Sequence, residues 1–226
     1  MRNTNICLLL ALLGLSASKK GYQAPKTDQQ KPMIMTTASV TMATDQLTPQ
    51  EREYAITLLT QTEAGVFASI KGFTDAQLQY KPATDKWSVE DCVKHIAAAE
   101  KELWQMADAV LKLPANPDQR AGIKFTDAQL VAAVEDRSHK SKTFAALEPA
   151  NSPYKTVAEA LKAFKENRKK LIAFVKNTQR DLRNHVVVLP LGTYDSYQFI
   201  LLIAAHSNRH TQQLEEVKNS TDFPKN

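Results

Sequence analysis

The stretch SVEDCVKHIAAAEKELWQMADAVL, residues 88–111, decides the fold of this chain. It opens with Ser88 and, three positions later, Asp91, which is the spacing of a capping box at a helix start. Apolar side chains then recur every three or four residues, at Val89, Cys92, Val93, Ile96, Ala99, Leu103, Met106 and Val110. This spacing places them on one face of a helix, and other apolar faces must cover it. The stretch therefore predicts a long helix that is buried along one side.

Four more capping patterns occur along the chain, and helical spacing follows each of them. They begin at Thr48, Thr74, Thr126 and Thr156. The helix expected over Asp127–Leu147 is the weakest, and a last apolar stripe holds Phe199, Leu202, Ile203, Leu214 and Val217. Elements that are each apolar on one side must pack on one another, so we predict an all-α helix bundle. The run Val186–Leu189 has no evident strand partner, and we interpret it as a connection.

The composition and charge exclude several classes of protein. The 226 residues include 29 Lys and Arg against 24 Asp and Glu, a net charge of +5. Residues 1–47 hold five of the basic residues and two of the acidic ones, so the rest of the chain carries only +2 and shows no basic stripe. Nucleic acid is therefore not an expected partner. No apolar run reaches the roughly 18 residues of a membrane span, and two cysteines exclude a disulfide scaffold.

The N-terminus has the layout of a secretory signal peptide. Arg2 supplies an early positive charge, residues 6–15 are apolar, and residues 16–18 are small. We interpret residues 1–18 as this signal, and a short buried or frayed helix is the alternative. The protein is thus expected to be exported, to the periplasm or the extracellular space, with no membrane span after cleavage.

A tether and one folded domain are expected after the signal. Residues 19–47 are rich in Thr, Gln, Lys, Ala and Pro without any period, which predicts disorder. The domain is expected over residues 48–218, with a short tail over residues 219–226. Cys92 would then be the only cysteine left, and its place on an apolar stripe predicts a small buried side chain rather than a reactive thiol.

Three of the five histidines fall on apolar helix faces. His206 and His210 are four residues apart and share one face, and His95 borders the buried face of residues 88–111. Buried imidazoles are neutral, and each needs a hydrogen-bond partner or a metal ion. They could bind a divalent Zn, Ni, Cu, Fe or Mn ion with a position open for substrate, or they could be core histidines satisfied by hydrogen bonds. His139 and His185 are expected at the surface.

The sequence resembles the DinB-like (DinB/YfiT) superfamily over roughly residues 50–218. The resemblance rests on DKWSVEDCVKHI at residues 85–96, GTYD at residues 192–195 and AHSNRHTQQ at residues 205–213. It implies a four-helix bundle of up-down-down-up order that holds a divalent metal through three histidines. Carried onto this chain, those ligands are His95, His206 and His210.

Other polar and aromatic side chains near these motifs have weaker assignments. Glu102 and Gln213 are candidates for an acid or base or for a partner of a ligating histidine, although a solvated glutamate is the simpler interpretation of Glu102. Arg209 lies off the apolar face and is expected in solvent. Trp87 and Trp104 are expected in the core or at the rim of the bundle.

Three functions are compatible with these features. The first is a metal-dependent enzyme that transfers a thiol or hydrolyses a small substrate. Members of the superfamily with known chemistry are similar to thiol-dependent enzymes, including bacillithiol transferases and mycothiol-dependent isomerases. Export instead favours hydrolysis or a plain binding role, because small thiols are scarce and oxidised outside the cytosol. The second is a non-catalytic exported bundle that binds a metal or a small molecule. The third is a structural or interaction module, and a homodimer is left open.

Export can be tested on the protein from its native host. If residues 1–18 are a cleaved signal, mass spectrometry of the mature protein should find an N-terminus near Lys19. A cytoplasmic protein that still begins at Met1 or Arg2 would contradict this assignment.

Overall fold

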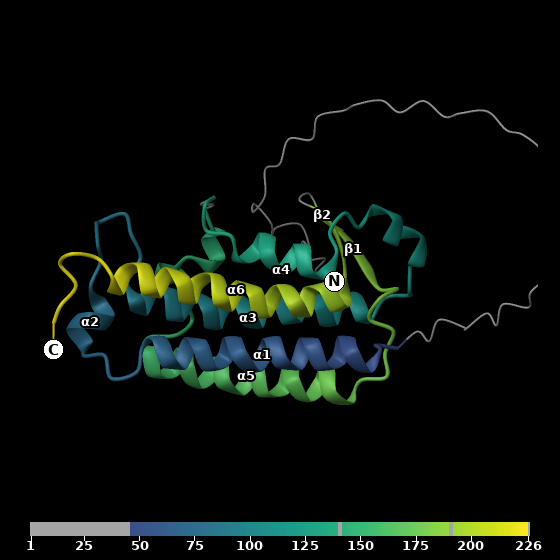
Figure 1. Ribbon diagram of the computed structural model, residues 1–226, viewed down its shortest axis with the longest axis horizontal. Coiled ribbons are helices and arrows are strands. Elements are labelled where there is room, and N and C mark those ends of the chain that lie inside the picture. The colour runs from purple at the N-terminus through teal and green to yellow at the C-terminus, as the bar shows by residue number, and fades with distance from the viewer. Residues whose placement is uncertain (1–45, 140–141, 190–191, 226) are drawn as a thin grey trace, which may run out of the picture.

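The computed structural model describes residues 46–139, 142–189 and 192–225, so the expected signal and nearly all of the tether lie outside the described residues. Four long helices run side by side, with α3 and α6 in one layer and α1 and α5 in the other (Figure 1). These helices are α1 (Pro49–Ser69), α3 (Val89–Leu111), α5 (Val157–Asn177) and α6 (Ser196–Lys218). The predicted helix bundle is thus confirmed. No helix in the described ranges is both long and apolar enough to cross a membrane.

Side-chain contacts define the direction of each helix. The hydroxyl of Tyr197, at the start of α6, donates to the carbonyl of Glu51, at the start of α1, so these two helices are parallel. Arg52 donates to the carbonyl of Thr178 just after α5, which makes α1 and α5 antiparallel. Trp104, late in α3, packs on Phe174, late in α5, with ring centroids 4.8 Å apart, so α3 and α5 are parallel. The order along the chain is therefore up-down-down-up, as the family resemblance implies.

This order requires one long crossover, because α3 and α5 run in the same direction. The described parts of residues 112–156, which we call the crossover, lie along the bundle, and α4 within them lies against α6 (Figure 1). The shorter α2 (Asp75–Gln79) joins α1 to α3. The crossover contains η1 (Pro117–Gly122), α4 (Asp127–Glu135), η2 (Ala145–Leu147) and η3 (Pro149–Asn151).

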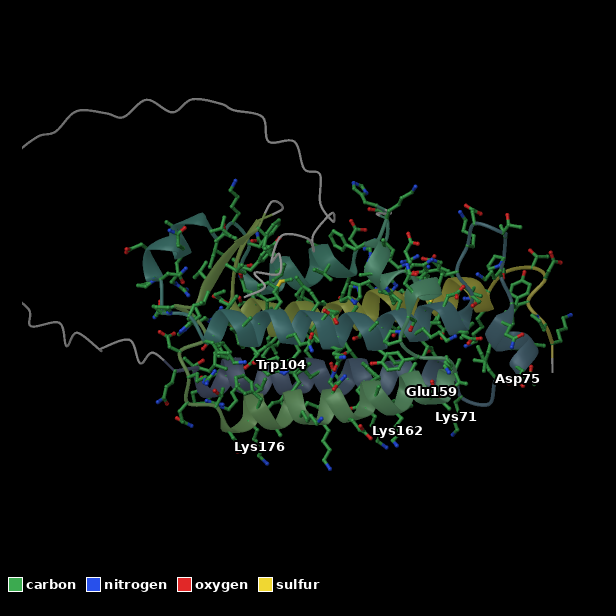
Figure 2. All side chains as sticks on the ribbon, turned by 180° about the vertical axis from the view of Figure 1, so that it is seen from behind. Lys71, Asp75, Trp104, Glu159, Lys162 and Lys176 are labelled. Carbon is green, nitrogen blue, oxygen red and sulfur yellow. The ribbon has the colours of Figure 1, made fainter. Side chains whose placement is uncertain are left out.

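The capping patterns form as the sequence predicts. Complete boxes are present at Thr48, Thr74, Ser88 and Thr126, with side chain and backbone hydrogen-bonded in both directions. At Thr156 the side chain caps the Glu159 amide, but the carboxylate of Glu159 accepts from the Lys155 amide instead. On α5, Lys162 and Lys176 project away from the bundle (Figure 2).

The helix expected over Asp127–Leu147 is wrong in its second half. α4 ends at Glu135, and Asp136 adopts an extended conformation at its C-cap. The Asp136 carboxylate accepts from the Ser138 amide at 2.8 Å, and the carbonyls of Val134 and Asp136 accept from Arg209. A side chain from α6 therefore satisfies carbonyls at the helix end, which allows the chain to leave the helix.

The connection expected at Val186–Leu189 is instead a strand, and this interpretation was also wrong. β1 (Val186–Leu189) pairs in antiparallel fashion with β2 (Gly192–Asp195), with Val186 opposite Asp195. The partner strand follows at once along the chain, but GTYD lacks the apolar alternation that would mark it. The side chain of Asn116 fixes the hairpin by exchanging hydrogen bonds with both backbone groups of Val186, at 2.8 and 2.9 Å.

Both ends of the packed chain reach beyond residues 48–218. Leu47 is buried in the core next to α1. Phe223 packs on Phe73 and Tyr80, with ring centroids 5.5 Å apart in each case. The expected tail is thus folded against the α2 end of the bundle, at least up to this residue.

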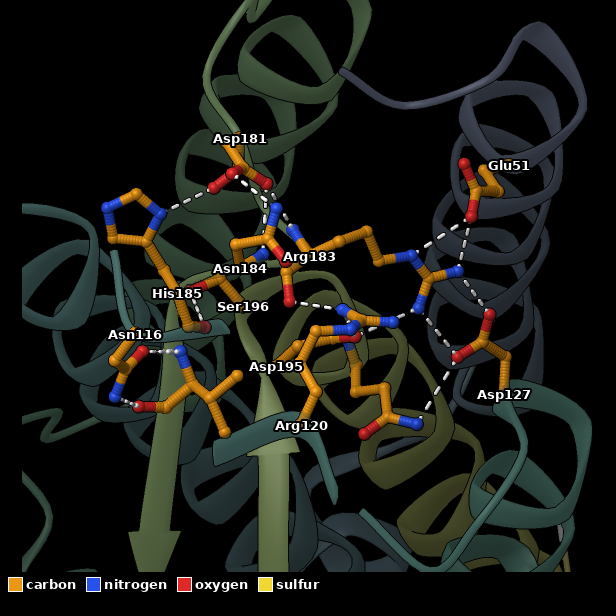
Figure 3. A network of polar contacts seen from close by, with 12 residues as sticks. Glu51, Asn116, Arg120, Asp127, Asp181, Arg183, Asn184, His185, Asp195 and Ser196 are labelled. Carbon is orange, nitrogen blue, oxygen red and sulfur yellow. Dashed lines mark hydrogen bonds and ion pairs between the residues drawn. The ribbon is translucent and has the colours of Figure 1, made fainter. Parts of the chain in front are cut away.

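An ion network closes the end of the bundle that carries the hairpin (Figure 3). Arg183 lies between Glu51 and Asp127, each at 2.5 Å, and Asp195 at 3.1 Å. Its guanidinium also lies 4.1 Å from the centroid of the Tyr197 ring. Because the carboxylates come from the starts of α1, α4 and α6, the network fixes where these helices begin.

A buried Arg–Glu pair occupies the middle of the bundle and touches all four long helices. Arg168 of α5 is 0% exposed, and its guanidinium forms a bidentate contact with Glu100 of α3 at 2.6 and 2.9 Å. It also donates to the Leu59 carbonyl, to Thr62 of α1 and to Ser207 of α6, all at 2.7 to 2.8 Å. All five N–H groups of the guanidinium are therefore satisfied. Burial raises the pKa of Glu100, and Arg168 counteracts this rise.

We expect Glu100→Leu to lower the free energy of unfolding by about 3–5 kcal/mol, because Arg168 would remain buried without its counter-ion. The matched control is Glu215→Leu, which breaks an exposed pair with Lys218 and should change the free energy by at most about 1 kcal/mol. Urea unfolding measures both. Glu100→Leu combined with Arg168→Met should be more stable than Glu100→Leu alone, and a double variant that is less stable would refute this account.

Candidate metal centre

Three histidines meet where the first turns of α3 pack against the central turns of α6. His95 projects from the second turn of α3, and His206 and His210 project from successive turns of α6. Their ring centroids lie 4.4 to 5.1 Å apart, and the rings are only 2 to 8% exposed. One ring nitrogen from each falls within 4.8 Å of the others. The structure therefore brings together all three residues that the sequence singles out.

Hydrogen bonds define which nitrogens face the centre. His95 Nδ1–H donates to the carbonyl of Leu147 at 2.8 Å, and His210 Nδ1–H donates to Oε1 of Gln213 at 2.9 Å. A carbonyl oxygen can only accept, so in both rings the proton resides on Nδ1 and Nε2 carries the lone pair. This is the arrangement of ligating histidines, in which the second nitrogen is held by a hydrogen bond.

His206 differs from the other two. Its Nε2 lies 3.3 Å from the Nε2 of His95, which has no proton of its own. In the described part of the chain the His206 ring has no other hydrogen-bond partner, so its Nε2–H donates to His95 in the metal-free protein. His206 could present a lone pair to an ion only if its proton moved to Nδ1, so it is the ring of the three whose tautomer would have to change for metal binding.

All three imidazoles are neutral at pH 7. Burial lowers the pKa of His95 to about 4. Burial also lowers the pKa values of His206 and His210 well below the ordinary range, and the neighbouring imidazoles lower them further. Neutral imidazole is the form that binds metals.

The donor set fits a divalent ion. Tetrahedral ligands at about 2.1 Å from zinc lie about 3.4 Å from one another. The His95 and His206 nitrogens are 3.3 Å apart, and one nitrogen of each of the three rings lies within 4.8 Å of the others. Three nitrogen donors leave coordination positions open, as catalytic zinc sites do. Trp87 covers one side, with its ring stacked on His210 at 5.7 Å and 4.8 Å from His95.

A cavity of about 1280 Å³ leads to the three histidines. Its walls come from α3, α6, residues 81–87 before α3, Tyr194 of β2 and the crossover, which contributes Arg137, Phe144, Leu147 and Tyr154. The cavity is large enough for a small organic molecule. The crossover residues were not anticipated, because nothing in the sequence between residues 136 and 156 shows that this segment packs over the ends of α3 and α6.

The other candidate residues separate clearly. Gln213 is the hydrogen-bond partner of His210, one of the roles foreseen for it. Glu102 is half-exposed and is not among the described residues that line the cavity. Arg209 was expected in solvent, but it is only 8% exposed, because it donates to carbonyls of the crossover, including that of His139 at 2.6 Å.

The remaining histidines and Trp104 lie away from the centre. The His139 side chain is exposed, as expected, although on a loop rather than on a helix. His185 is half-buried, and its two ring nitrogens lie 2.6 and 3.1 Å from the carbonyls of Asp181 and Leu113. Trp104 packs between helices at the rim of the bundle.

Comparisons with known proteins support this fold. A model of the DinB superfamily matches residues 58–214. The uncharacterized protein YuaE of Bacillus subtilis (strain 168) is 25% identical over 156 residues, which are 68% of this chain and 90% of YuaE. The solved structure of YfiT from Bacillus subtilis, described as a probable metal-dependent hydrolase with an unusual four-helix bundle topology, aligns with a TM-score of 0.54 and 14% identity over 79% of this chain and 91% of that one. The last match shows a shared fold.

The lowered pKa of His95 makes the metal-free protein acid-sensitive. In the unfolded chain this histidine takes up a proton near pH 6.5, but in the folded protein only near pH 4. Stability is therefore greatest above pH 6.5 and falls as the pH decreases, by about 3 kcal/mol at pH 4 from His95 alone. Urea unfolding between pH 7 and pH 4.5 should show a shallower pH dependence for His95→Asn. The exposed counterpart, His139→Asn, should follow the parent, and equal slopes in all three proteins would contradict this explanation.

Proposed function

The chain belongs to the DinB superfamily, and from this premise we propose that it is a divalent-metal-dependent enzyme that hydrolyses a small molecule. The observation that carries the proposal is the set of three buried, neutral imidazoles, His95, His206 and His210, at the inner end of a cavity. A purely structural role would not require three imidazole rings to face one point beside a cavity. YfiT, described as a probable metal-dependent hydrolase, supports the same direction for a protein of this fold.

Residues around the three histidines orient the rings and shield them from bulk water. Leu147 and Gln213 hold the rings of His95 and His210 with Nε2 toward the centre. Trp87 shields the cluster from bulk water on one side, and the cavity admits substrate on the other. A divalent ion held by the three histidines would supply Lewis-acid chemistry, which polarises an electrophilic oxygen and acidifies a nucleophile.

The chain itself supplies no thiol to the reaction within its described part. Cys92 lies one turn before His95 but is fully buried, and burial raises the pKa of its thiol. Thiol transfer would therefore need a free low-molecular-weight thiol. We favour hydrolysis because the proposed export places the protein where such thiols are scarce.

A non-catalytic metal-binding bundle is the second candidate. The side chain that contacts His210 is the amide of Gln213, which orients the ring but cannot exchange a proton at neutral pH. A site built only for binding would need nothing more. Turnover distinguishes the two functions.

Metal content tests the three-histidine site. We expect the purified protein to hold about one equivalent of a divalent ion by elemental analysis, and His206→Ala to lose most of it, because two histidines rarely retain such an ion. The matched control His139→Ala changes an exposed histidine and should keep the parent content. A His206→Ala variant that holds as much metal as the parent would exclude the site.

Activity tests the reaction. The protein is loaded with Zn, Ni, Mn or Fe and assayed on esters, amides and lactones, and for thiol conjugation to electrophiles. We expect hydrolysis of at least one class, at a rate that falls by two orders of magnitude or more in His206→Ala, since activation of the nucleophile is lost. If conjugation alone exceeds the His206→Ala background, the enzyme transfers thiols, and if neither reaction does, the binding function is the better assignment.

A further inference from the structure

We propose that Arg137 is a positioning residue of the three-histidine site and that it acts by fixing the tautomer of His210 through Gln213. The reason for such positioning, the binding of a metal ion by the three histidines, rests on the proposed function. Arg137 belongs to the crossover, two residues beyond the end of α4, whereas His210 and Gln213 lie on α6. A guanidinium has no lone pair to offer a metal ion, so Arg137 cannot itself be a ligand.

A chain of three contacts leads from the surface to the centre. Glu216 binds the guanidinium of Arg137 in bidentate fashion, at 2.6 and 2.7 Å. Nη1 of Arg137 then lies 3.4 Å from Oε1 of Gln213, and the same oxygen accepts from Nδ1–H of His210 at 2.9 Å. The Arg137 side chain is only 12% exposed, so its position is well defined by packing as well as by the ion pair.

The orientation of the Gln213 amide determines which ring nitrogen of His210 carries the proton. A glutamine side chain can present either its oxygen or its NH₂ group to a neighbour, and the two orientations have opposite hydrogen-bonding properties. If the NH₂ group faced His210, Nδ1 would become an acceptor and the proton would move to Nε2. The lone pair that a metal needs would then be lost from the nitrogen that faces the centre.

Arg137 prevents this exchange because a guanidinium can only donate. It is satisfied by the oxygen of Gln213 and would oppose the NH₂ group of a flipped amide. Glu216 keeps the guanidinium in place, since bidentate carboxylate contacts fix both distance and plane. The crossover thus orients two of the three rings: Arg137 acts on His210 through Gln213, and the carbonyl of Leu147 holds His95.

The experiment determines the tautomer of His210 in the metal-free full chain at pH 7, by long-range ¹⁵N–¹H correlation spectra. We expect the parent to carry the proton on Nδ1 and Arg137→Met to move a substantial fraction to Nε2. Zinc affinity should fall by about 10- to 100-fold in the same variant, which is the usual effect of losing an outer partner of a ligand. The matched control is Lys218→Met, which removes an exposed cation that pairs with Glu215 on the same helix, and it should leave both measurements unchanged.

A second substitution separates orientation from structure. Gln213→Glu replaces the amide by a carboxylate, which only accepts and needs no neighbour to orient it. Combined with Arg137→Met, it should restore the proton to Nδ1 and recover zinc affinity, which a merely structural role for Arg137 would not allow. If Arg137→Met fails to fold, Glu216→Gln loosens the guanidinium and should give a smaller shift of the same kind.

The outcomes distinguish this proposal from the function on which it rests. His210 with its proton fully on Nδ1 in Arg137→Met, or in Glu216→Gln, overturns the role of Arg137 whatever the metal content. A parent protein that binds no zinc while the tautomer shifts as expected overturns the proposed function and leaves the positioning role intact.

Discussion

The fully buried guanidinium of Arg168 is the constraint on which the rest of the structure depends. Removing a charge from water costs several kcal/mol unless each of its polar groups finds a partner. Here the partners are Glu100 and groups of α1 and α6, so the four long helices must meet at this depth and in this rotation. Such a pair contributes little net stability, and we interpret it as selecting one packing of the apolar stripes, a role that buried ionic groups serve in some proteins.

The same network determines where the histidines lie. Glu100 is five residues after His95 on α3, and Ser207 directly follows His206 on α6. Any rotation of α3 or α6 that moved the histidines apart would also break contacts to Arg168. At the opposite end of the bundle, Arg183 fixes the starts of α1, α4 and α6. The helices are thus held at the middle and at one end, and the cavity lies on the side where α3 and α6 face the crossover.

Burying three histidines in one place lowers the free energy of unfolding. Desolvating three polar imidazole rings in one place is costly, and burial also disfavours the protons that acid would add. A ligand that binds only the folded form would offset this cost through mass action. The crossover lies over the site and is held by Arg209 and by the carbonyl contact from Leu147 to His95. The position of the crossover and the orientation of the His95 ring therefore depend on each other.

The sequence by itself determined the helix bundle, the helix starts and the common face of His206 and His210, because each of these depends on local spacing. The family resemblance implied that His95 joins them, across 111 residues, and the tertiary structure brings it there. Capping boxes and apolar stripes are encoded within a few residues, and the interval from His206 to His210 alone puts both on one face. Only the tertiary structure decided the β-hairpin, the early end of α4 at Glu135, the burial of Arg209 and the approach of Arg137 to Gln213. Those features arise where a segment meets groups more than 70 residues away or a strand whose pattern is weak. A single local pattern carries no information on which carbonyls or carboxylates will be brought to it by the rest of the chain.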